Sequence, residues 1–211
     1  MPEEKNISMA VIRRLPRYFR YLSDLIKLDI KRISSRELSE RMCITASQIR
    51  QDLNCFGGFG QQGYGYNVES LYDEIGKILG VDKRFTCIII GAGNMGTALV
   101  NYENFKRRGY DILGIFDVDP NKIGKKISHM EILPFDSLPE FTAKNKVDIA
   151  MVTVPNSRIA DVASHITDLG IKGVWNFTPS DLRLGNGIVV ENVHLSDSLM
   201  VLGYRLRGEG Y

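Results

Sequence analysis

The chain is poor in cysteine and histidine, with only three of each among its 211 residues. The spacing of Cys43, Cys55 and Cys87 matches no zinc-binding or CxxC pattern, and their number is odd. We therefore interpret them as reduced thiols, each of which by default packs as a small buried hydrophobe. The histidines are too scattered in the sequence to indicate a metal site, and we expect no metal: they are His129, His165 and His194.

Long hydrophobic runs are also missing, because no segment approaches the roughly 18 to 20 apolar residues that a membrane-spanning helix needs. The stretch MPEEKNISMAVIRRL begins with acidic side chains and has a very short apolar run, unlike a secretory signal. Hydrophobic residues at 44% and charged residues at 25% are ordinary for a soluble globular protein. We expect a cytoplasmic protein of one large or two small domains, with no membrane contact.

The net charge of +2 is small, but the charges are unevenly distributed. Residues 5–66 hold 11 Lys and Arg against 5 Asp and Glu, whereas residues 67–211 hold 16 against 18. A basic N-terminal third on a mildly acidic remainder favours contact between the first part and a polyanion. A solvated basic surface is the alternative, and charge alone does not decide between the two.

The basic third has the pattern of a helix-turn-helix. Apolar residues from Leu15 to Ile26 recur at spacings of 4, 3 and 4, which predicts a helix with one buried face. Ser34 and Thr45 are each followed by Glu or Gln three positions later, which predicts two capping boxes. Two short helices joined by a brief break follow from this pattern, and the second runs to about Cys55.

The second of these helices leaves a polar and basic outer face. Arginine can pair with guanine through two hydrogen bonds, and Gln or Asn can pair with adenine in the same way. The alternative is an αα-hairpin whose outer face is merely solvated. We predict that the DNA-contacting residues are Ala46, Ser47, Gln48, Arg50, Gln51 and Asn54, together with Arg14 and Gly60.

A glycine- and aromatic-rich stretch, FGGFGQQGYGYNV, comes next. No regular helix survives five interleaved glycines, and the aromatic residues favour a short hairpin packed on the domain. After a helix-turn-helix such a hairpin is typical of the wing of a winged helix, and a plain glycine-rich linker is the alternative. A further helix over Ser70–Leu79 is predicted to bury Leu71, Ile75, Ile78 and Leu79.

The stretch CIIIGAGNMGTAL indicates a dinucleotide-binding domain. A strand over Phe85–Ile90 is followed by Gly91, Gly93 and Gly96 and then by a helix over Thr97–Arg108. In this pattern the glycines allow a tight turn, close approach of the pyrophosphate and packing of helix on strand. The free N–H groups of the helix N-terminus would face the pyrophosphate.

A second strand, YDILGIFD, ends at Asp117, 21 residues after Gly96. An acid at this place can accept hydrogen bonds from the ribose hydroxyls, and it repels a 2′-phosphate, so NAD is favoured over NADP. Three lysines lie nearby, Lys122, Lys125 and Lys126, so it stays open whether NADP is excluded. Coenzyme A and S-adenosylmethionine are the main rival ligands.

Strands and helices continue to alternate, which predicts a doubly wound parallel sheet. We expect strands in VDIAMVTVP, IKGVWNFTP and GIVVENV, the last at an edge, and a helix over Ile159–Leu169. Ligands bind beyond the carboxyl ends of such strands. The residues expected on that rim, in the nicotinamide half, are Thr153, Val154, Pro155, Asn176 and Phe177.

No residue set for catalysis is recognisable. Hydride transfer needs an acid–base group near the substrate, and His194, the best placed histidine, has no partner in a known motif. We therefore expect no enzyme activity, although a dehydrogenase with an accessory helical domain and a dinucleotide-binding scaffold for protein partners stay as alternatives. The terminal stretch LSDSLMVLGYRLRG has leucines at spacings of 4, 3 and 4, so its helix covers its own domain or packs on a second subunit.

Eight stretches of the chain occur together in one protein family: RLPRYFRYL, SSRELSERM, ASQIRQDLNCFGGFGQQGYGYNV, GAGNMGTALVNY, FDVDPNKIG, TVP, GIKGVWNFTP and VENV. In these stretches the chain resembles the Rex family of redox-sensing transcriptional repressors over nearly its whole length. The resemblance implies an α/β chain with a winged-helix domain, a Rossmann domain and a C-terminal helix exchanged between the subunits of a homodimer. It also implies binding to operators near genes of fermentation and anaerobic respiration, with release when NADH rises relative to NAD+.

The resemblance assigns domains and site residues. It gives a DNA-binding domain over 1–80, an NAD(H)-binding domain over 81–192 and a dimerisation helix over 193–211. It places Tyr102 near the nicotinamide and Arg20 at the domain interface. The cofactor-binding residues expected for NADH and NAD+ are Gly91, Ala92, Gly93, Asn94, Met95, Gly96, Asp117, Tyr102, Thr153, Val154, Pro155 and Phe177.

Two positions depart from the family pattern. Gln51 stands where the family often has lysine, so affinity or base preference is expected to differ. His194 stands where the family often has aspartate, which puts in doubt an ion pair between Arg20 and a carboxylate, although Asp197 is one turn further on.

Overall fold

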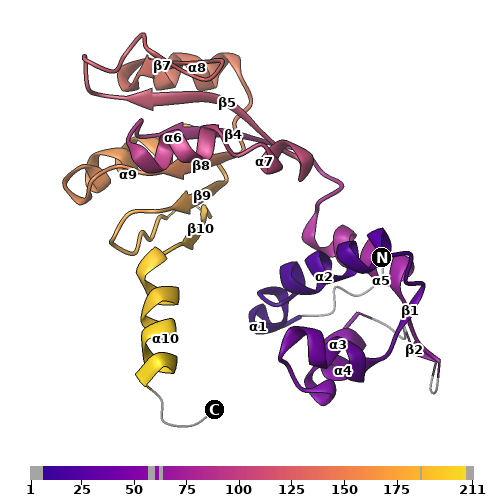
Figure 1. The fold of residues 1–211 in the computed structure, drawn as a ribbon. Coiled ribbons are helices and arrows are strands. Elements are labelled where there is room, and N and C mark those ends of the chain that lie inside the picture. The colour runs from indigo at the N-terminus through magenta and orange to yellow at the C-terminus, as the bar shows by residue number, and fades with distance from the viewer. Residues whose placement is uncertain (1–6, 57–59, 62–63, 186, 208–211) are drawn as a thin grey trace. The chain divides into compact units, whose positions relative to one another are not determined.

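The structure is a computed structural model that describes residues 7–56, 60–61, 64–185 and 187–207. It divides into two compact units, Met1–Lys83 and Arg84–Tyr211 (Figure 1). Each unit has its own hydrophobic core.

The first unit is a helical bundle with a small antiparallel sheet. Its helices are α1 (Met9–Ile12), α2 (Leu15–Lys27), α3 (Ser35–Met42), α4 (Ala46–Asn54) and α5 (Val68–Leu79). The strands β1 (Arg32–Ile33), β2 (Gly60–Gln61) and β3 (Gly65–Asn67) lie in the order β1-β3-β2. This is the arrangement of a winged helix, in which α3 and α4 form the helix-turn-helix and β2–β3 the wing.

Local signals in the sequence explain the helix-turn-helix. Ser34 and Glu37 form the predicted capping box in full, so α3 begins at Ser35. Cys43 adopts a left-handed conformation (φ 52°), which reverses the chain between the helices. Thr45 caps α4 by accepting the backbone N–H of Gln48. The second predicted box is wrong in its other half, because the Gln48 side chain donates to Asp52 and not to the cap backbone.

The hairpin predicted from the glycine-rich stretch is confirmed by the antiparallel pairing of β2 with β3. The positions 57–59 and 62–63, which include three of its glycines, lie outside the described residues. Gly65 has φ +70°, and a Cβ there would lie 2.7 Å from the Ile33 carbonyl oxygen, so the unpredicted strand β1 needs glycine opposite it. Ile78 is 36% exposed, so its predicted burial on α5 is wrong.

The second unit is built on a seven-stranded sheet in the order β10-β9-β8-β4-β5-β7-β6. Six strands run parallel: β4 (Phe85–Ile90), β5 (Tyr110–Asp117), β7 (Met130–Pro134), β8 (Ile149–Val152), β9 (Gly173–Asn176) and β10 (Val189–Asn192). Only β6 (Lys126–Ile127) is antiparallel among the described strands of this sheet. The chain turns from β5 on one side of β4 to β8 on the other, which creates the crevice where doubly wound folds bind ligands.

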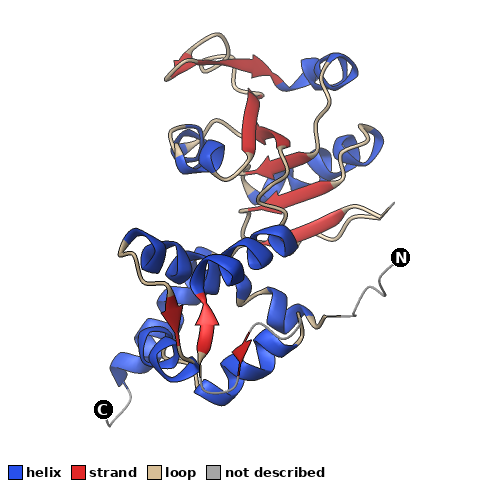
Figure 2. Ribbon diagram, turned by 90° about the vertical axis from the view of Figure 1, so that its right-hand side faces the viewer, coloured by secondary structure: helices blue, strands red, loops and turns tan. Residues whose placement is uncertain are grey.

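Helices cover both faces of this sheet (Figure 2). On one face, α6 (Asn94–Val100) packs through Leu99 against Cys87 and Ile89 of β4. On the other, α8 (Leu138–Lys144) and α9 (Ile159–Asp168) share a core with Ile88 and Ile90. Alternate residues of β4 therefore face opposite layers, and both layers are apolar, which explains its uninterrupted hydrophobic run.

Several elements of the second unit differ from the prediction. The helix expected over Thr97–Arg108 is two helices, α6 and α7 (Asn104–Arg107), and it starts earlier, at Asn94. The hairpin β6–β7 and helix α8 were not predicted. Short 3₁₀ turns at Phe135–Ser137 and Asn156–Arg158 precede α8 and α9.

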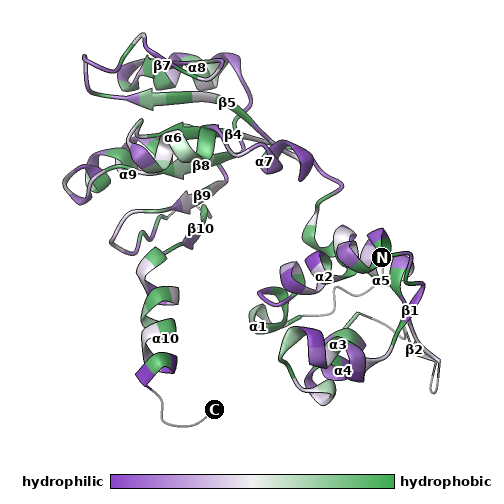
Figure 3. Ribbon diagram, viewed as in Figure 1, coloured by the Kyte–Doolittle hydropathy of each residue, from purple (hydrophilic) through white to green (hydrophobic). Residues whose placement is uncertain are grey.

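The last helix, α10 (Leu195–Arg207), buries none of its residues. Hydrophobic positions occur along most of its length (Figure 3). Its large apolar side chains are all more than half exposed: Leu195, Leu199, Met200, Val201, Leu202, Tyr204 and Leu206.

Candidate functional site

A side chain would meet different surroundings at each of the three glycines in the loop after β4. Gly91 has φ +108°, and a Cβ there would lie 2.9 Å from the Thr153 carbonyl oxygen. A Cβ on Gly96 would lie 2.0 Å from the Gly91 carbonyl oxygen, so the first turn of α6 can approach β4 only without a side chain. A Cβ on Gly93 would meet nothing within 4 Å, which leaves open space where a ligand backbone contact is expected.

Thr153, which directly follows strand β8, forms hydrogen bonds to this loop. Its hydroxyl donates to the carbonyl oxygen of Gly91 at 2.8 Å and lies 3.2 Å from that of Ile90. The sequence placed Thr153 only on the rim of the crevice, and its bonds to the loop could not be seen without the pairing of β4 with β8. The loop is therefore held in shape by the protein itself.

Asp117 lies at the carboxyl end of β5 and is almost buried. Its carboxylate accepts the backbone N–H of Ala92 at 2.7 Å and that of Asp119 at 2.9 Å, and it pairs with Lys122 at 3.2 Å. Burial alone would raise the pKa of Asp117, but these N–H donors and the lysine lower it below its usual value. Three of the roughly four lone-pair sites of an ionised carboxylate are thereby used, which leaves one for a ligand hydroxyl.

A cavity of about 510 Å³ opens beside the loop. This is within the size range of small-molecule and cofactor sites. Lys122 and Arg158 supply positive charge to its wall, and the sequence singled out only the lysine. The predicted residues that line the cavity are Gly91, Gly93, Asp117, Thr153, Val154 and Pro155.

Four other predicted cofactor residues do not line this cavity. Ala92, Asn94, Met95 and Gly96 form the rest of the loop and the first turn of α6, whose N-terminus has no side-chain cap. Because that turn leaves backbone N–H groups unpaired within the helix, it suits an anionic group.

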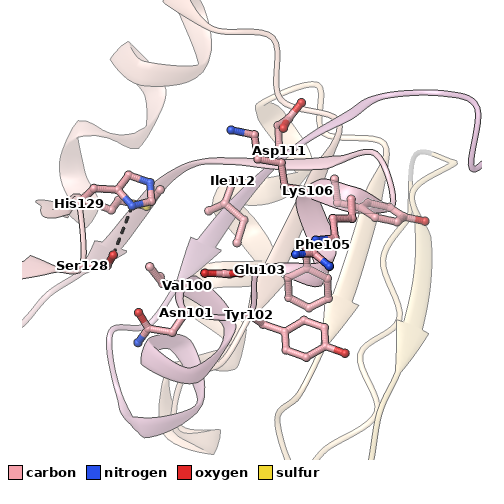
Figure 4. Close-up of a pocket in the computed structure, with 13 residues that line it drawn as sticks. Val100, Asn101, Tyr102, Glu103, Phe105, Lys106, Asp111, Ile112, Ser128 and His129 are labelled. Atoms are coloured by element: carbon pink, nitrogen blue, oxygen red, sulfur yellow. Dashed lines mark hydrogen bonds between the residues drawn. The ribbon is translucent and has the colours of Figure 1, made fainter.

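Tyr102 and Phe177 are not among the cavity's lining residues. Tyr102 lies beside a second cavity of about 500 Å³, which is drawn in Figure 4, and packs edge-on against Phe105 with ring centroids 4.8 Å apart. Phe177 packs against Trp175, with ring centroids 4.4 Å apart, on the α6 side of the sheet. Phe105 and Trp175 connect the two aromatic residues through ring contacts, and Phe177 packs in the same cluster as Ala92 and Met95 of the glycine loop.

The outer face of α4 presents the predicted polar side chains. Ser47, Arg50, Gln51 and Asn54 are exposed, whereas Ile49 and Leu53 are buried in the core. Arg50 donates to the Ser35 hydroxyl at 3.0 Å, which ties its guanidinium to the start of α3. This face combines donors and acceptors suited to base edges with one fixed positive charge.

The four other predicted DNA-contacting residues have different surroundings. Arg14 and Gln48 both direct their side chains to the buried carboxylate of Asp52, and both are only partly exposed. Ala46 is half-buried at the start of α4, and Gly60 lies in β2 opposite Tyr66. The sequence did not single out Asp52, because an acid on the inner face of α4 carries no recognisable signal.

The two positions that depart from the family pattern, Gln51 and His194, lie in different units, and Arg20 lies in the same unit as Gln51. Arg20 is exposed on α2, with its guanidinium 6.0 Å from the Tyr21 ring centroid. His194 contacts Asp181 through Nε2 at 2.8 Å, just before α10. Among the residues that the structure describes, no three His, Cys, Asp or Glu residues gather as a metal site. Within the same residues, no helix has the length and apolar character needed to span a membrane.

A winged helix joined to a Rossmann unit with a glycine loop, a ribose-type acid and a cavity defines a DNA-binding protein with a nucleotide-binding domain. Two family models match the same two parts: "Putative DNA-binding protein N-terminus" over residues 6–54 and "CoA binding domain" over residues 82–180. The redox-sensing transcriptional repressor Rex of Thermoanaerobacter pseudethanolicus is 54% identical over 209 residues, which cover 99% of this chain and 93% of the relative. The chain belongs to the Rex family of redox-sensing transcriptional repressors.

Other relatives agree. The Rex repressor of Clostridioides difficile is 54% identical and covers 96% of this chain and 97% of its own. The crystal structure of RSP in complex with beta-NAD+ and operator DNA has a TM-score of 0.88 and 56% identity, and covers 95% of this chain and 92% of RSP. RSP in complex with beta-NADH also has a TM-score of 0.88, with 52% identity over 95% of this chain and 94% of RSP. The likeness extends over both units, so the predicted fold class is confirmed for the winged helix and the Rossmann unit.

Proposed function

We propose that the protein is a homodimeric repressor that binds palindromic operator DNA and releases it when NADH binds. One observation carries this proposal: a single chain joins the polar reading face of α4 to a glycine loop braced by Thr153 and Asp117. The crystallised complexes of RSP with beta-NAD+ and operator DNA, and with beta-NADH, support the same pairing of ligands. In this proposal residues 1–80 read DNA, 81–192 bind the dinucleotide and 193–211 dimerise.

The dinucleotide site fits NADH and NAD+. Asp117 keeps a lone pair for a ribose hydroxyl, and its negative charge repels a 2′-phosphate. Lys122 does not reverse this preference, because its ammonium is paired with Asp117 at 3.2 Å. The pyrophosphate would meet the loop from Gly91 to Gly96, and Tyr102 and Phe177 are proposed to act at the nicotinamide end.

Sensing follows from the one charge by which the two forms of the cofactor differ. The oxidised nicotinamide ring is a cation and the reduced ring is neutral, and burying a charge against apolar groups such as Val154 and Pro155 is unfavourable. NADH would therefore stabilise a closed dimer, while the oxidised or empty protein leaves the paired reading helices available for DNA. A ligand shifts such an equilibrium only through its different affinities for the two states.

The homodimer is supported by α10. Seven large apolar side chains on one short helix are more than half exposed, which is unusual for a helix that stays unpaired in water. A two-fold dimer places two copies of α4 on successive major grooves, so the operator should be palindromic. We further propose that the protein acts in the cytoplasm and is a sensor with no enzyme activity.

Two substitutions test the assignment of the units. Asp117→Ala should weaken NADH binding at least about tenfold and leave operator binding in NAD+ unchanged, because it removes the ribose acceptor and the loop contact to Ala92. Arg50→Ala should weaken operator binding by roughly 5- to 150-fold and leave NADH binding unchanged. Fluorescence titration with NADH and a gel shift with operator DNA measure the two affinities.

The reverse pattern, in which Asp117→Ala loses DNA and Arg50→Ala loses NADH, would refute the assignment. A robust kcat for oxidation of bound NADH by small aldehydes or 2-keto acids would instead favour a dehydrogenase with an accessory domain. Absence of salt-dependent DNA binding would favour a scaffold for protein partners.

A further inference from the structure

A buried carboxylate sits on the inner face of the proposed reading helix. Asp52 of α4 is 0% exposed and is held by three side chains. Arg14 donates to both of its oxygens, through Nε at 2.7 Å and Nη2 at 2.6 Å. The Tyr18 hydroxyl donates at 2.9 Å, and the Gln48 side-chain amide donates at 2.8 Å.

These contacts connect different elements. Tyr18 belongs to α2 and Arg14 lies at the N-cap of the same helix, whereas Asp52 is 34 and 38 residues further along, on α4. Two-point binding of a carboxylate by a guanidinium fixes direction as well as distance. The cluster therefore resists rotation of α4 about its own axis. The apolar contacts of Ile49 and Leu53 also oppose this rotation, but they fix the orientation of the helix less specifically.

The protonation states keep the cluster intact. Burial would raise the pKa of Asp52, but the bonds from Arg14, Gln48 and Tyr18 lower it overall, so the carboxylate stays an ionised acceptor. Burial and the bond to Asp52 raise the pKa of Tyr18, so its hydroxyl stays a donor. No buried side-chain polar atom among the described residues lacks a hydrogen-bond partner, so this network is complete.

The reading face depends on this geometry. Ser47, Arg50, Gln51 and Asn54 point outward only if Asp52 points inward, because successive helix residues are about 100° apart. Contacts that discriminate between bases need positions held to within about 0.5 Å and 10–20°. Gln48 and two N–H groups of Arg14 are already engaged by Asp52, so they are poorly placed to read DNA.

We propose that Asp52 is a positioning residue for operator recognition, and that Arg14 and Tyr18 act through it by holding α4 at a fixed rotation against α2. This inference rests on the proposed role of α4 as the reading helix. It assigns to Arg14 the role of holding Asp52, in place of the direct DNA contact expected from the sequence.

The mildest test is Tyr18→Phe in the full chain, with Tyr21→Phe on the same helix as the matched control. The DNA probe is a duplex enriched from a random-sequence pool by the unmodified chain, beside a scrambled duplex of equal length. We expect Tyr18→Phe to weaken binding to the enriched duplex by about tenfold and to leave the scrambled duplex unaffected. Tyr21→Phe should change neither affinity, and circular dichroism should show both variants folded at the assay temperature.

Arg14→Met separates positioning from phosphate contact. Loss of a phosphate contact lowers the slope of log K against log salt by about 0.9, whereas loss of positioning lowers affinity at an unchanged slope. We expect the unchanged slope. Adding Asp52→Asn to Arg14→Met should cause less than the sum of the two single losses, because the charge stranded by the first change is then removed.

Two outcomes would overturn the positioning role on its own: an enriched duplex bound equally well by Tyr18→Phe and the unmodified chain, or a slope that falls by about 0.9 in folded Arg14→Met. If Arg14→Met does not fold, Tyr18→Phe decides. If the unmodified chain enriches no duplex at all, the proposed function fails, and the positioning role fails with it.

Discussion

The glycines of the loop after β4 differ in what a side chain would meet. Their spacing in the sequence predicted a dinucleotide loop, and the structure shows why two of them admit no Cβ while the third faces open space. A Cβ at Gly96 would collide with the protein, whereas a Cβ at Gly93 would meet nothing within 4 Å. A substitution at Gly96 therefore tests folding, and a substitution at Gly93 tests ligand binding.

Gly96→Ala should lower the free energy of unfolding by more than about 2 kcal/mol, because the new methyl group would meet the Gly91 carbonyl. Gly93→Ala should change it by less than about 0.5 kcal/mol and yet weaken NADH binding about tenfold or more, because the methyl group occupies the ligand's space. Thermal unfolding and NADH titration measure the two effects. Equal destabilisation by both substitutions would contradict the distinction.

Asp148 links the start of β4 to β8 through its carboxylate. It accepts the backbone N–H and the hydroxyl of Thr86, both at 3.0 Å, and pairs with Lys146 at 2.9 Å. Burial would raise its pKa, but these contacts lower it overall below the usual 3.8. The unfolded chain therefore binds the proton first as the pH falls, so the stability that Asp148 contributes is present above about pH 4 and lost below it.

Asp148→Asn should accordingly flatten the acid limb of the stability curve. We expect the unfolding free energy of the unmodified chain to fall more steeply than that of the variant between about pH 5 and pH 3, measured by urea unfolding. Asp136→Asn removes an exposed carboxylate and should keep the steep limb. Parallel curves for Asp148→Asn and the unmodified chain would show that this carboxylate adds nothing to acid stability.

Several side-chain roles could not be predicted from the sequence. Gln48 fitted both a capping box and a base-reading residue, but Asp52 four positions later captures its amide. Arg14 is captured by the same acid across 38 residues. Such pairings depend on how α2 and α4 pack, which local patterns do not contain.

Helices and strands with strong local signals were predicted well. The spacing of apolar residues gave α2, and the Ser34 capping box gave the start of α3, because both signals lie within one or two helical turns. The buried strands β4 and β5 were recognisable as apolar runs ending at glycine or aspartate. Their boundaries follow the sequence because both faces of the sheet are covered.

Elements with weak local signals were missed or merged. The stretch Thr97–Arg108 was predicted as one helix, yet α6 ends at Val100 and α7 begins at Asn104. The residues between include Asn101 and Tyr102, which are weak helix formers. The strand β6 is only two residues long, and β1 exists because Gly65 lets it approach β3. Strands this short are set by their partners in the sheet, so the sequence around them is not diagnostic.

The exposed apolar residues of α10 lead to a prediction about the proposed dimer. Leu199→Glu places a charge in the row formed by Leu195, Leu199, Leu202 and Leu206, and should convert a dimer to a monomer in light scattering. Tyr204→Glu adds the same charge on the side of the helix opposite that row and should leave the dimer intact. Loss of the dimer should weaken operator binding by at least about tenfold, because the two half-sites are no longer bound together. A Leu199→Glu variant that stays dimeric would show that the leucine row is not the interface.

The molecule as a whole joins two functions that the sequence revealed in separate parts. Charge asymmetry and the helix-turn-helix indicated DNA, and the glycine pattern with Asp117 indicated a dinucleotide. The relation between them came from the family resemblance, because no single motif encodes the coupling of two domains. Coupling of this kind amounts to about 1–3 kcal/mol in regulated proteins, which is enough to change operator affinity substantially.

The most direct measurement is the affinity of the purified chain for its enriched palindromic duplex in saturating NAD+ and in saturating NADH, at one fixed salt concentration. We predict binding about 5- to 150-fold weaker in NADH than in NAD+. Equal affinity in the two cofactor forms would contradict the proposed redox sensing.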